Sequence, residues 1–292
     1  MKKKHREGLT ALCFLAPNLI GFLIFTAIPV VMSFVMSLYD WPVVGERRFV
    51  GFDNYKNLFT ADPLFGKVMG NTVFYVAAYA VLNILIAMLL AVWLTSKIKN
   101  LKFYRAAFFM PQVIPVIATT MLWKWLFLPE YGLINIALNT FGFKEINFLG
   151  STKTAMMSIV IMSVWQGFGY NMVIFIAGLL GVPQSLKEAA RIDGCGRIRT
   201  YFKVTLPLMS PSIFFAVIMT IISSFQVFDQ TFIGTNGGPA YSTTTAVMYI
   251  YQNGFNFMKM GYASSIAWVL FAIIMIITVF QWFAQKKWVV YD

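Results

Sequence analysis

The chain has 292 residues, of which 59% are hydrophobic and only 12% are charged, and its formal net charge is +12 at pH 7. Soluble domains are about 25% charged, so this composition excludes an ordinary soluble domain and indicates a membrane protein. The basic excess could suit a nucleic-acid-binding protein, but such proteins gather their cations on one soluble face, and no segment here is long enough to form one.

Six stretches are apolar enough and long enough for the ~20-residue helix that crosses a bilayer. We predict an all-α integral membrane protein in which the whole chain, 1–292, forms one transmembrane domain. The first stretch is too long for a signal-peptide core and lacks a small-residue cleavage site, so we expect it to remain as an anchor. The predicted spans are 10–38, 70–95, 106–128, 154–180, 208–233 and 262–284.

Cationic residues lie mainly on alternate connections between these spans. Of the 23 lysines and arginines, 15 belong to the two termini, the connection after the second span and the loop 181–207. The positive-inside rule therefore predicts that both termini and the loop 181–207 are cytoplasmic. The 15 residues are Lys2, Lys3, Lys4, Arg6, Lys97, Lys99, Lys102, Arg105, Lys187, Arg191, Arg197, Arg199, Lys203, Lys286 and Lys287.

The sequence offers few groups for catalysis or metal binding. Its one histidine, His5, lies in the N-terminal tail, so a Ser-His-Asp arrangement within the membrane is not available. Two cysteines, Cys13 and Cys195, are too few to form a zinc site with that histidine. The phosphate-binding motif G-x-x-x-x-G-K-[ST] is missing from the sequence. We predict no enzyme activity, metal or cofactor, and any ATP would have to bind to another subunit.

The fourth span carries Trp165, Gln166, Gly169 and Tyr170 on one half of a helix. An aromatic ring beside an amide is a common sugar-binding pair, because the apolar face of a pyranose stacks while its hydroxyls form hydrogen bonds. The alternative is structural, since the spacing of Gly167 and Gly169 allows close helix packing and Trp and Tyr often anchor interfaces. Packing is the favoured interpretation.

The loop 181–207 contains signals for a short helix. Pro183 ends the fourth span, Ser185 and Glu188 fit a capping box, and Gly194 fits a left-handed stop. The small face of this helix would consist of Leu186, Ala189 and Ala190. Such a helix could dock onto a soluble partner or could simply lie on the membrane surface, and local physics alone slightly favours the second interpretation.

The fifth span contains a polar stripe. At 100° per residue its polar side chains share an arc of about 120°, whereas its phenylalanines fall on the other side. A carboxylate within a span is costly unless it faces protein or water, so the stripe is a candidate substrate path. Alternatively, the aspartate is hydrated at the membrane boundary or bonds a neighbouring helix. The polar residues are Ser223, Gln226, Asp229 and Gln230, and the aromatic ones are Phe225, Phe228 and Phe232.

The loop also carries a spaced motif. It reads Glu188-Ala189-Ala190, then Gly194, Val204 and Leu206-Pro207. This resembles the cytoplasmic signature of permease subunits in binding-protein-dependent ABC importers, and the whole chain resembles the maltose- and multiple-sugar-type permeases. Cys195 stands where that family usually has alanine, and Val204 where it usually has isoleucine. Further matching stretches are 49–55, 71–72, 131–135 and 236–239.

The resemblance implies a type I ABC importer permease fold with six transmembrane helices and a cytoplasmic coupling helix, in a bacterial cell membrane. The helix would dock in a groove of an ATPase, through the coupling residues Glu188, Ala189, Ala190, Asp193, Gly194, Leu206 and Pro207. Implied partners are a second homologous permease with which the chain would form a heterodimer, two cytoplasmic ATPases that bind ATP and Mg²⁺, and an extracytoplasmic solute-binding protein. The implied cargo is a carbohydrate, for which the predicted path residues are Trp165, Gln166, Tyr170, Ser223, Gln226, Asp229 and Gln230.

Two other functions remain open at this point. The first is an ion-coupled secondary carrier in which Asp229 titrates, but such carriers usually show inverted repeats and matching broken helices, which the sequence does not show convincingly. The second is an ABC importer permease for a non-sugar solute such as glycerol phosphate. A phosphorylated cargo would favour cations facing the path, and the predicted spans contain no obvious cationic cluster.

Overall fold

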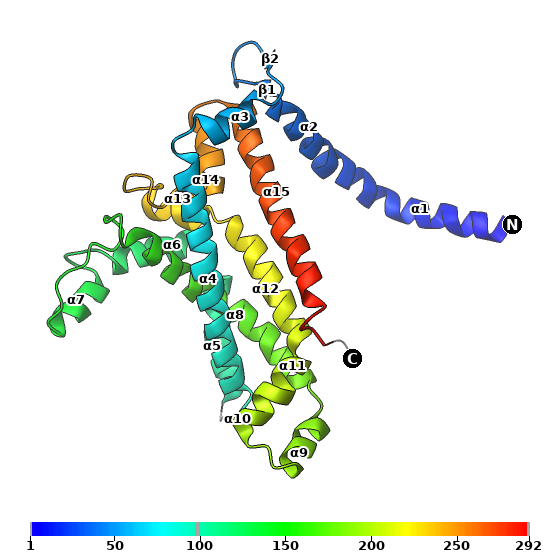
Figure 1. The fold of residues 1–292 in the computed structure, drawn as a ribbon, viewed down its shortest axis with the longest axis vertical. Helices are drawn as coiled ribbons and strands as arrows, with labels where there is room; N and C mark the ends of the chain where they lie inside the picture. Colours follow the sequence, from blue (N-terminus) through cyan, green and yellow to red (C-terminus); the bar gives the residue numbers. More distant parts are fainter. Residues whose placement is uncertain (1, 97–99, 291–292) are drawn as a thin grey trace. The chain divides into compact units, whose positions relative to one another are not determined.

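The computed structural model describes residues 2–96 and 100–290, and most of them are helical (Figure 1). Lys97 and Lys99, which contribute to the predicted charge asymmetry, lie outside the described residues. Contacts divide the chain into two compact units, Met1–Asp62 with Ile250–Leu270 and Pro63–Tyr249 with Phe271–Asp292. The single domain over 1–292 stays a prediction.

The smaller unit begins with a long helix and continues into short elements. None of the residues in the most apolar window of Cys13–Ser37 is buried in the described chain. Asn54 is buried and donates hydrogen bonds to the carbonyls of Ser37 and Tyr39 at 2.8 and 2.9 Å, which satisfies backbone groups just where the helix ends. The elements are α1 (Lys2–Phe22), π-helix η1 (Leu23–Ala27), α2 (Ile28–Ser37), antiparallel strands β1 (Tyr39–Asp40) and β2 (Arg48–Phe49), α3 (Asp53–Thr60) and π-helix η3 (Gln252–Asn256).

The larger unit is built around one central helix, α8. It is the most buried of the candidate spans and packs against α4, α5 and α12. The elements are α4 (Phe65–Leu94), α5 (Leu101–Val113), α6 (Val116–Leu126), α7 (Leu133–Thr140), α8 (Ala155–Gly181), α9 (Gln184–Ile192), α10 (Arg197–Thr200), π-helix η2 (Tyr201–Thr205), α11 (Leu206–Leu208), α12 (Ser210–Phe225) and α13 (Asp229–Thr235). Two further helices, α14 (Ala246–Tyr251) and α15 (Met260–Gln285), contribute residues to both units.

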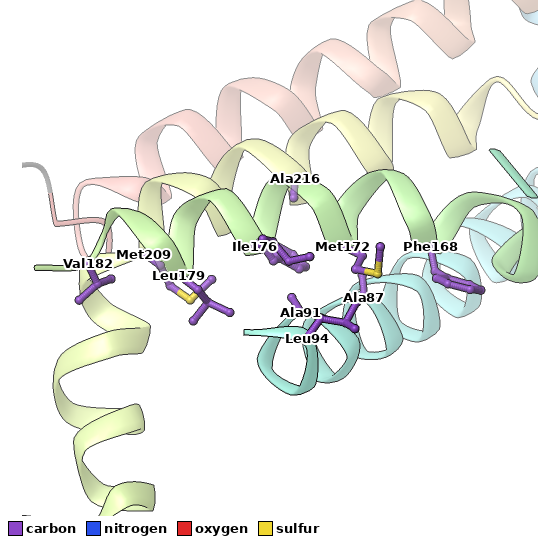
Figure 2. Packing of buried hydrophobic residues seen from close by; sticks show 11 residues of the cluster. Ala87, Ala91, Leu94, Phe168, Met172, Ile176, Leu179, Val182, Met209 and Ala216 are labelled. Atoms are coloured by element: carbon purple, nitrogen blue, oxygen red, sulfur yellow. The ribbon is translucent and has the colours of Figure 1, made fainter. Parts of the chain in front are cut away.

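The apolar core of the larger unit depends on small residues. Figure 2 shows Met172 and Ile176 of α8 beside Ala87 and Ala91, which lie one turn apart on α4. Lipid tails are as apolar as these side chains, so burial alone supplies little drive for helix association in a bilayer. Close approach over alanines instead maximises van der Waals contact.

A buried polar cluster joins three of these helices. The Nδ2 group of Asn171 on α8 donates to Asn83 Oδ1 on α4 at 2.7 Å and to Thr220 Oγ1 on α12 at 2.8 Å. All three side chains are buried. Such bonds are directional, so they specify the relative rotation of the helices in a way that apolar packing does not.

Four of the described helices are long and apolar enough to cross a membrane. The number of candidate spans rises to six if each of two bent helix pairs is counted as one span. The predicted third span, 106–128, corresponds to one of these bent pairs, in which α5 and α6 meet at a 97° bend. Pro115 is the cause. The residue before a proline is pushed out of the helical region, and Ile114 is indeed extended, with φ −72° and ψ 134°.

The predicted fifth span, 208–233, is wrong as one helix. A 67° bend separates Arg197–Leu208 from α12, and α12 ends at Phe225. Residues 226–228 connect it to α13, and they contain neither proline nor glycine. The hydroxyl of Thr245 donates to the carbonyl of Val227 at 3.0 Å, so a distant side chain satisfies the backbone at this second break.

The close packing of α8 against α5 can be tested by substitution at Gly169. A Cβ atom at this position would lie 2.6 Å from the carbonyl oxygen of Phe108. We expect Gly169→Ala to lower the free energy of unfolding by about 1–3 kcal/mol, because backbone cannot move aside as a side chain can. Thermal unfolding of the purified permease in detergent measures this.

Gly181→Ala is the matched control, since Gly181 ends the same helix and a Cβ there meets nothing within 4 Å. Equal melting temperatures for the two variants would contradict the packing argument.

Candidate functional site

A cavity of about 520 Å³ lies in the larger unit, where the two helix breaks meet α4 and α8. Residues 112–116 line it from the α5–α6 break, and residues 226–230 line it from the α12–α13 break. Unwound backbone at membrane depth is tolerated only where it is buried in protein or lines a water-filled cavity. The breaks and the cavity are therefore parts of one feature.

Gln166 connects α8 to the first break. Its Nε2 group donates to the carbonyl of Ile114 at 3.0 Å, which replaces the helical bond lost before Pro115. The side chain is only 7% exposed, and its Oε1 atom has no hydrogen-bond partner among the described residues. This oxygen atom is itself buried, so the observed role of Gln166 is to support the backbone at the break.

Two tyrosines that the sequence analysis did not select form the aromatic part of the wall. Tyr75 and Tyr79 stack one turn apart on α4, with ring centroids 5.6 Å apart and an interplanar angle of 5°. Gly167 on α8 makes room for them, because a Cβ there would collide with the hydroxyl of Tyr79. The available signal was two tyrosines at i and i+4 within an otherwise apolar span.

The predicted path residues divide into two groups. Five of them line the cavity: Gln166, Ser223, Gln226, Asp229 and Gln230. Trp165 and Tyr170 do not, since Trp165 packs edge-on against Trp123 and Tyr170 is 44% exposed. A role for these two residues in the path stays a prediction.

The helical stripe itself needs correction. The predicted arc assumed one helix through residue 230, whereas α12 ends at Phe225 and α13 begins at Asp229. The polar residues still reach one cavity, because they flank the break on both sides. Phe228 also lines the cavity, although the arc placed it on the opposite side, and Phe225 is buried as expected of a packing residue.

The lining of the cavity carries little charge. Asp229 is the one charged side chain among the described residues that line it, and the rest of its polar surface comes from amides, hydroxyls and backbone. Asp229 is in the first turn of α13, where the helix dipole favours a carboxylate. The cavity therefore suits a neutral molecule rich in hydrogen-bonding groups.

The loop 181–207 forms the predicted short helix, α9, but not the predicted capping box. Pro183 occupies the N-cap position and no side chain caps the helix, so Ser185 already lies inside its first turn. Glu188 instead accepts a hydrogen bond from Gln184 Nε2 at 3.2 Å. The expected start of the helix was wrong because Pro183 is itself the N-cap.

The end of α9 agrees with the sequence prediction. Gly194 has φ +80°, in the left-handed region. The N–H of Cys195 donates to the carbonyl of Ala190 at 2.9 Å, and the N–H of Gly194 donates to that of Arg191 at 3.0 Å. This pair of bonds is the Schellman arrangement, which closes a helix tightly.

The surface of α9 is partly apolar. Ile192 is 87% exposed and Leu186 and Ala189 are also exposed, whereas Ala190 is buried against the rest of the unit. The small face expected from Leu186, Ala189 and Ala190 is therefore divided between an outer and an inner side. Glu188 and Asp193 are exposed, and Leu206 and Pro207 are half-buried in α11.

Broken helices around a polar cavity, together with an exposed helix on a loop between spans, are typical of a membrane transport subunit. The chain belongs to the family of binding-protein-dependent transport system inner membrane components, which matches residues 83–286. It is a multi-pass membrane protein. The resemblance to importer permeases that the loop motif suggested is confirmed.

Relatives cover almost the full chain. It is 35% identical to the probable ABC transporter permease protein YesP of Bacillus subtilis (strain 168), over 100% of this chain and 96% of the relative. It is also 35% identical to the multiple sugar-binding transport system permease protein MsmF of Streptococcus mutans serotype c, over 94% of each. The fold resembles a chain in the crystal structure of a bacterial alginate ABC transporter in complex with alginate pentasaccharide-bound periplasmic protein. The TM-score is 0.83 at 19% sequence identity, over 98% of this chain and 97% of that chain. The predicted all-α permease fold is confirmed.

Thr245 provides a test of the second break. Its hydroxyl supports the carbonyl of Val227, and the side chain is fully buried. We expect Thr245→Val to lower the free energy of unfolding by about 1–3 kcal/mol, because it leaves a buried acceptor without its donor. Thr245→Ser keeps the hydroxyl and should recover most of the loss. Thermal unfolding of both purified variants measures the difference, and equal stability would contradict a supporting role for the hydroxyl.

Proposed function

We propose that this chain is the transmembrane permease subunit of an ATP-driven ABC importer that takes up a carbohydrate, in particular an oligosaccharide, delivered by an extracytoplasmic binding protein. The observation that carries the proposal is the cavity at the helix breaks, which combines neutral hydrogen-bonding groups with stacked tyrosines. The multiple sugar-binding permease MsmF, to which the chain is 35% identical, supports the same cargo class.

The chemistry of the cavity suits a sugar. Gln226 and Gln230 each offer donors and an acceptor, and Asp229 can accept from two hydroxyls. The half-buried ring of Tyr79 can pack against the apolar face of a pyranose, with the buried ring of Tyr75 stacked behind it. A volume of about 520 Å³ is within the range of small-molecule sites. Many weak, exchangeable bonds also allow release, which a transport path requires.

The same chemistry disfavours the alternatives. A phosphorylated cargo such as glycerol phosphate would need cations, whereas the described lining contains no lysine, arginine or histidine and does contain Asp229. An ion-coupled carrier is disfavoured by membership of a binding-protein-dependent transport family. The lining of the cavity therefore favours a neutral sugar over a phosphorylated solute.

The loop helix α9 would transmit the motion of an ATPase. Its exposed Glu188, Leu186 and Ile192 offer a carboxylate flanked by apolar groups, which suits a groove on a soluble partner. The tight end at Gly194 keeps the helix from fraying at the point where force would pass onward. ATP and Mg²⁺ would bind to two cytoplasmic ATPase subunits, because this chain lacks a phosphate-binding motif.

A continuous path leads from this loop to the cavity. From Gly196 the chain runs through α10, η2 and α11, turns by 67° at Met209 and continues as α12 to the break at Gln226. Leu206 and Pro207 lie at that turn, so movement of α9 would tilt α12 and reshape the cavity wall. A second homologous permease would complete the pathway, and both termini would be cytoplasmic.

Gln226 tests the assignment of the cavity. We expect Gln226→Leu to raise the KM for oligosaccharide uptake about three- to tenfold, because a neutral hydrogen bond contributes about 0.5–1.5 kcal/mol. Uptake by proteoliposomes containing the complete importer measures this. Gln281→Leu on α15 removes the same group outside the cavity and should leave the KM unchanged. Equal effects of the two variants would remove the cavity from the substrate path.

Glu188 tests the coupling role. We expect Glu188→Ala to lower both ATPase recovery and ATP-dependent sugar uptake by at least about tenfold, since loss of one partner of an interface charge pair costs 2–5 kcal/mol. The variant should still accumulate in the membrane, because the side chain is exposed. Membranes carrying all the transport subunits are compared for co-purified ATPase and for uptake.

Glu145→Ala removes an exposed carboxylate from another loop and should have no effect. Uptake that persists without any ATPase and follows an ion gradient would overturn the importer, and Asp229 would then become the residue to study.

A further inference from the structure

A second cavity, of about 320 Å³, lies where α4 and α8 end and the loop helices begin. Val92 of α4 and Leu179 and Leu180 of α8 form its apolar wall. Lys187 and Arg191 of α9 and Arg197 of α10 form its polar wall, together with hydroxyl groups. This cavity is separate from the one at the helix breaks and shares no lining residue with it.

The charge of this second cavity is of one sign. Three cations line it, and no acidic residue is among the described lining residues. Lys187 donates one hydrogen bond, to the carbonyl of Leu179 at 3.3 Å. The side chains of Arg191 and Arg197 form no hydrogen bond or ion pair with other described residues. Three like charges around one cavity attract an anion to it.

Ordinary structural roles account for only part of this set. Lys187 satisfies a carbonyl at the end of α8, and Arg191 is in the last turn of α9, where the helix dipole favours a cation. Arg197 is the first residue of α10, and there the same dipole disfavours a positive charge. The positive-inside rule accounts for a cation in this loop, and an anion in the cavity would account for the position of Arg197 at the start of α10.

The position of the cavity identifies the source of the anion. Two candidate spans end beside it, at Leu94 and Gly181. Phospholipid phosphates lie at this level, just outside the hydrocarbon core. Leu180 is 66% exposed and continues the apolar wall outward, so acyl chains could lie against the helices while the headgroup enters the cavity.

We propose that this cavity binds the phosphate headgroup of an anionic phospholipid, with Lys187, Arg191 and Arg197 as its ligands. Basic pockets between transmembrane helices at the cytoplasmic side are suited to such headgroups. The lipid would fill the space between α9 and the ends of α4 and α8. It would thereby hold α9 at the membrane surface while the exposed side of α9, with Glu188 and Ile192, stays accessible to a partner.

Native mass spectrometry of the complete transport complex tests the proposal. The complex is reconstituted in nanodiscs of phosphatidylcholine with phosphatidylglycerol, released into detergent, and examined for retained phosphatidylglycerol. The triple variant Lys187→Gln, Arg191→Gln, Arg197→Gln should retain at least about tenfold less, since each cation near an anionic headgroup contributes about fivefold. The matched control Arg199→Gln, Lys203→Gln, Lys287→Gln removes the same charge outside the cavity and should retain at least half of the wild-type amount.

Other results would overturn the proposal. Equal losses in the two triple variants would indicate diffuse attraction to the membrane and no site. Displacement of the lipid by millimolar glycerol 3-phosphate or inorganic phosphate, with no preference for the intact phospholipid, would indicate a site for a soluble phosphate. If the first triple variant fails to accumulate, Arg197→Gln alone should lower retention about fivefold and Arg197→Lys should restore it, and unchanged retention in Arg197→Gln would refute the assignment.

Discussion

The rest of this structure depends on one constraint of the bilayer, which is that every backbone polar group at membrane depth must find a partner within the protein. Two spans are broken nonetheless. Gln166 supports the carbonyl of Ile114 at the first break, and Thr245 supports that of Val227 at the second. Because side chains from other elements satisfy these groups, the chain can leave the helical path and open a polar cavity without exposing backbone to lipid.

Because of the second break, α12 connects the turn at Met209 to the cavity. Its first end adjoins the turn at Met209, beyond which lie the loop helices, and its last residue adjoins the cavity. Asn171 holds the middle of α12 to α8 through Thr220. The first end of α12 is held as well, because the Oγ of Ser210 accepts a hydrogen bond from the N–H of Val290 at 2.9 Å.

Two cavities with different charges in their linings lie along α8. Gln166 faces a cavity with no described cation, and Leu179, thirteen residues further on, faces one with three. At 1.5 Å per residue these positions are about 20 Å apart. Because the cavity at the helix breaks contains Asp229 and no described cation, it would not attract the anionic headgroup that we propose for the cationic cavity.

The sequence alone determined the features that depend on local pattern. The apolar runs predicted α4, α8 and α15 to within a few residues, the left-handed stop at Gly194 is confirmed, and five polar residues predicted for the path do line one cavity. Tertiary structure decided where the helices break. Pro115 signals the first break, but residues 226–228 carry no such signal, because the group that stabilises the second break is the hydroxyl of Thr245, 18 residues away. Periodicity reports which side of a helix is polar. It cannot report a hydrogen bond from a distant loop. It also cannot show that Tyr75 and Tyr79 line the same cavity as the second break, because that depends on how the helices pack.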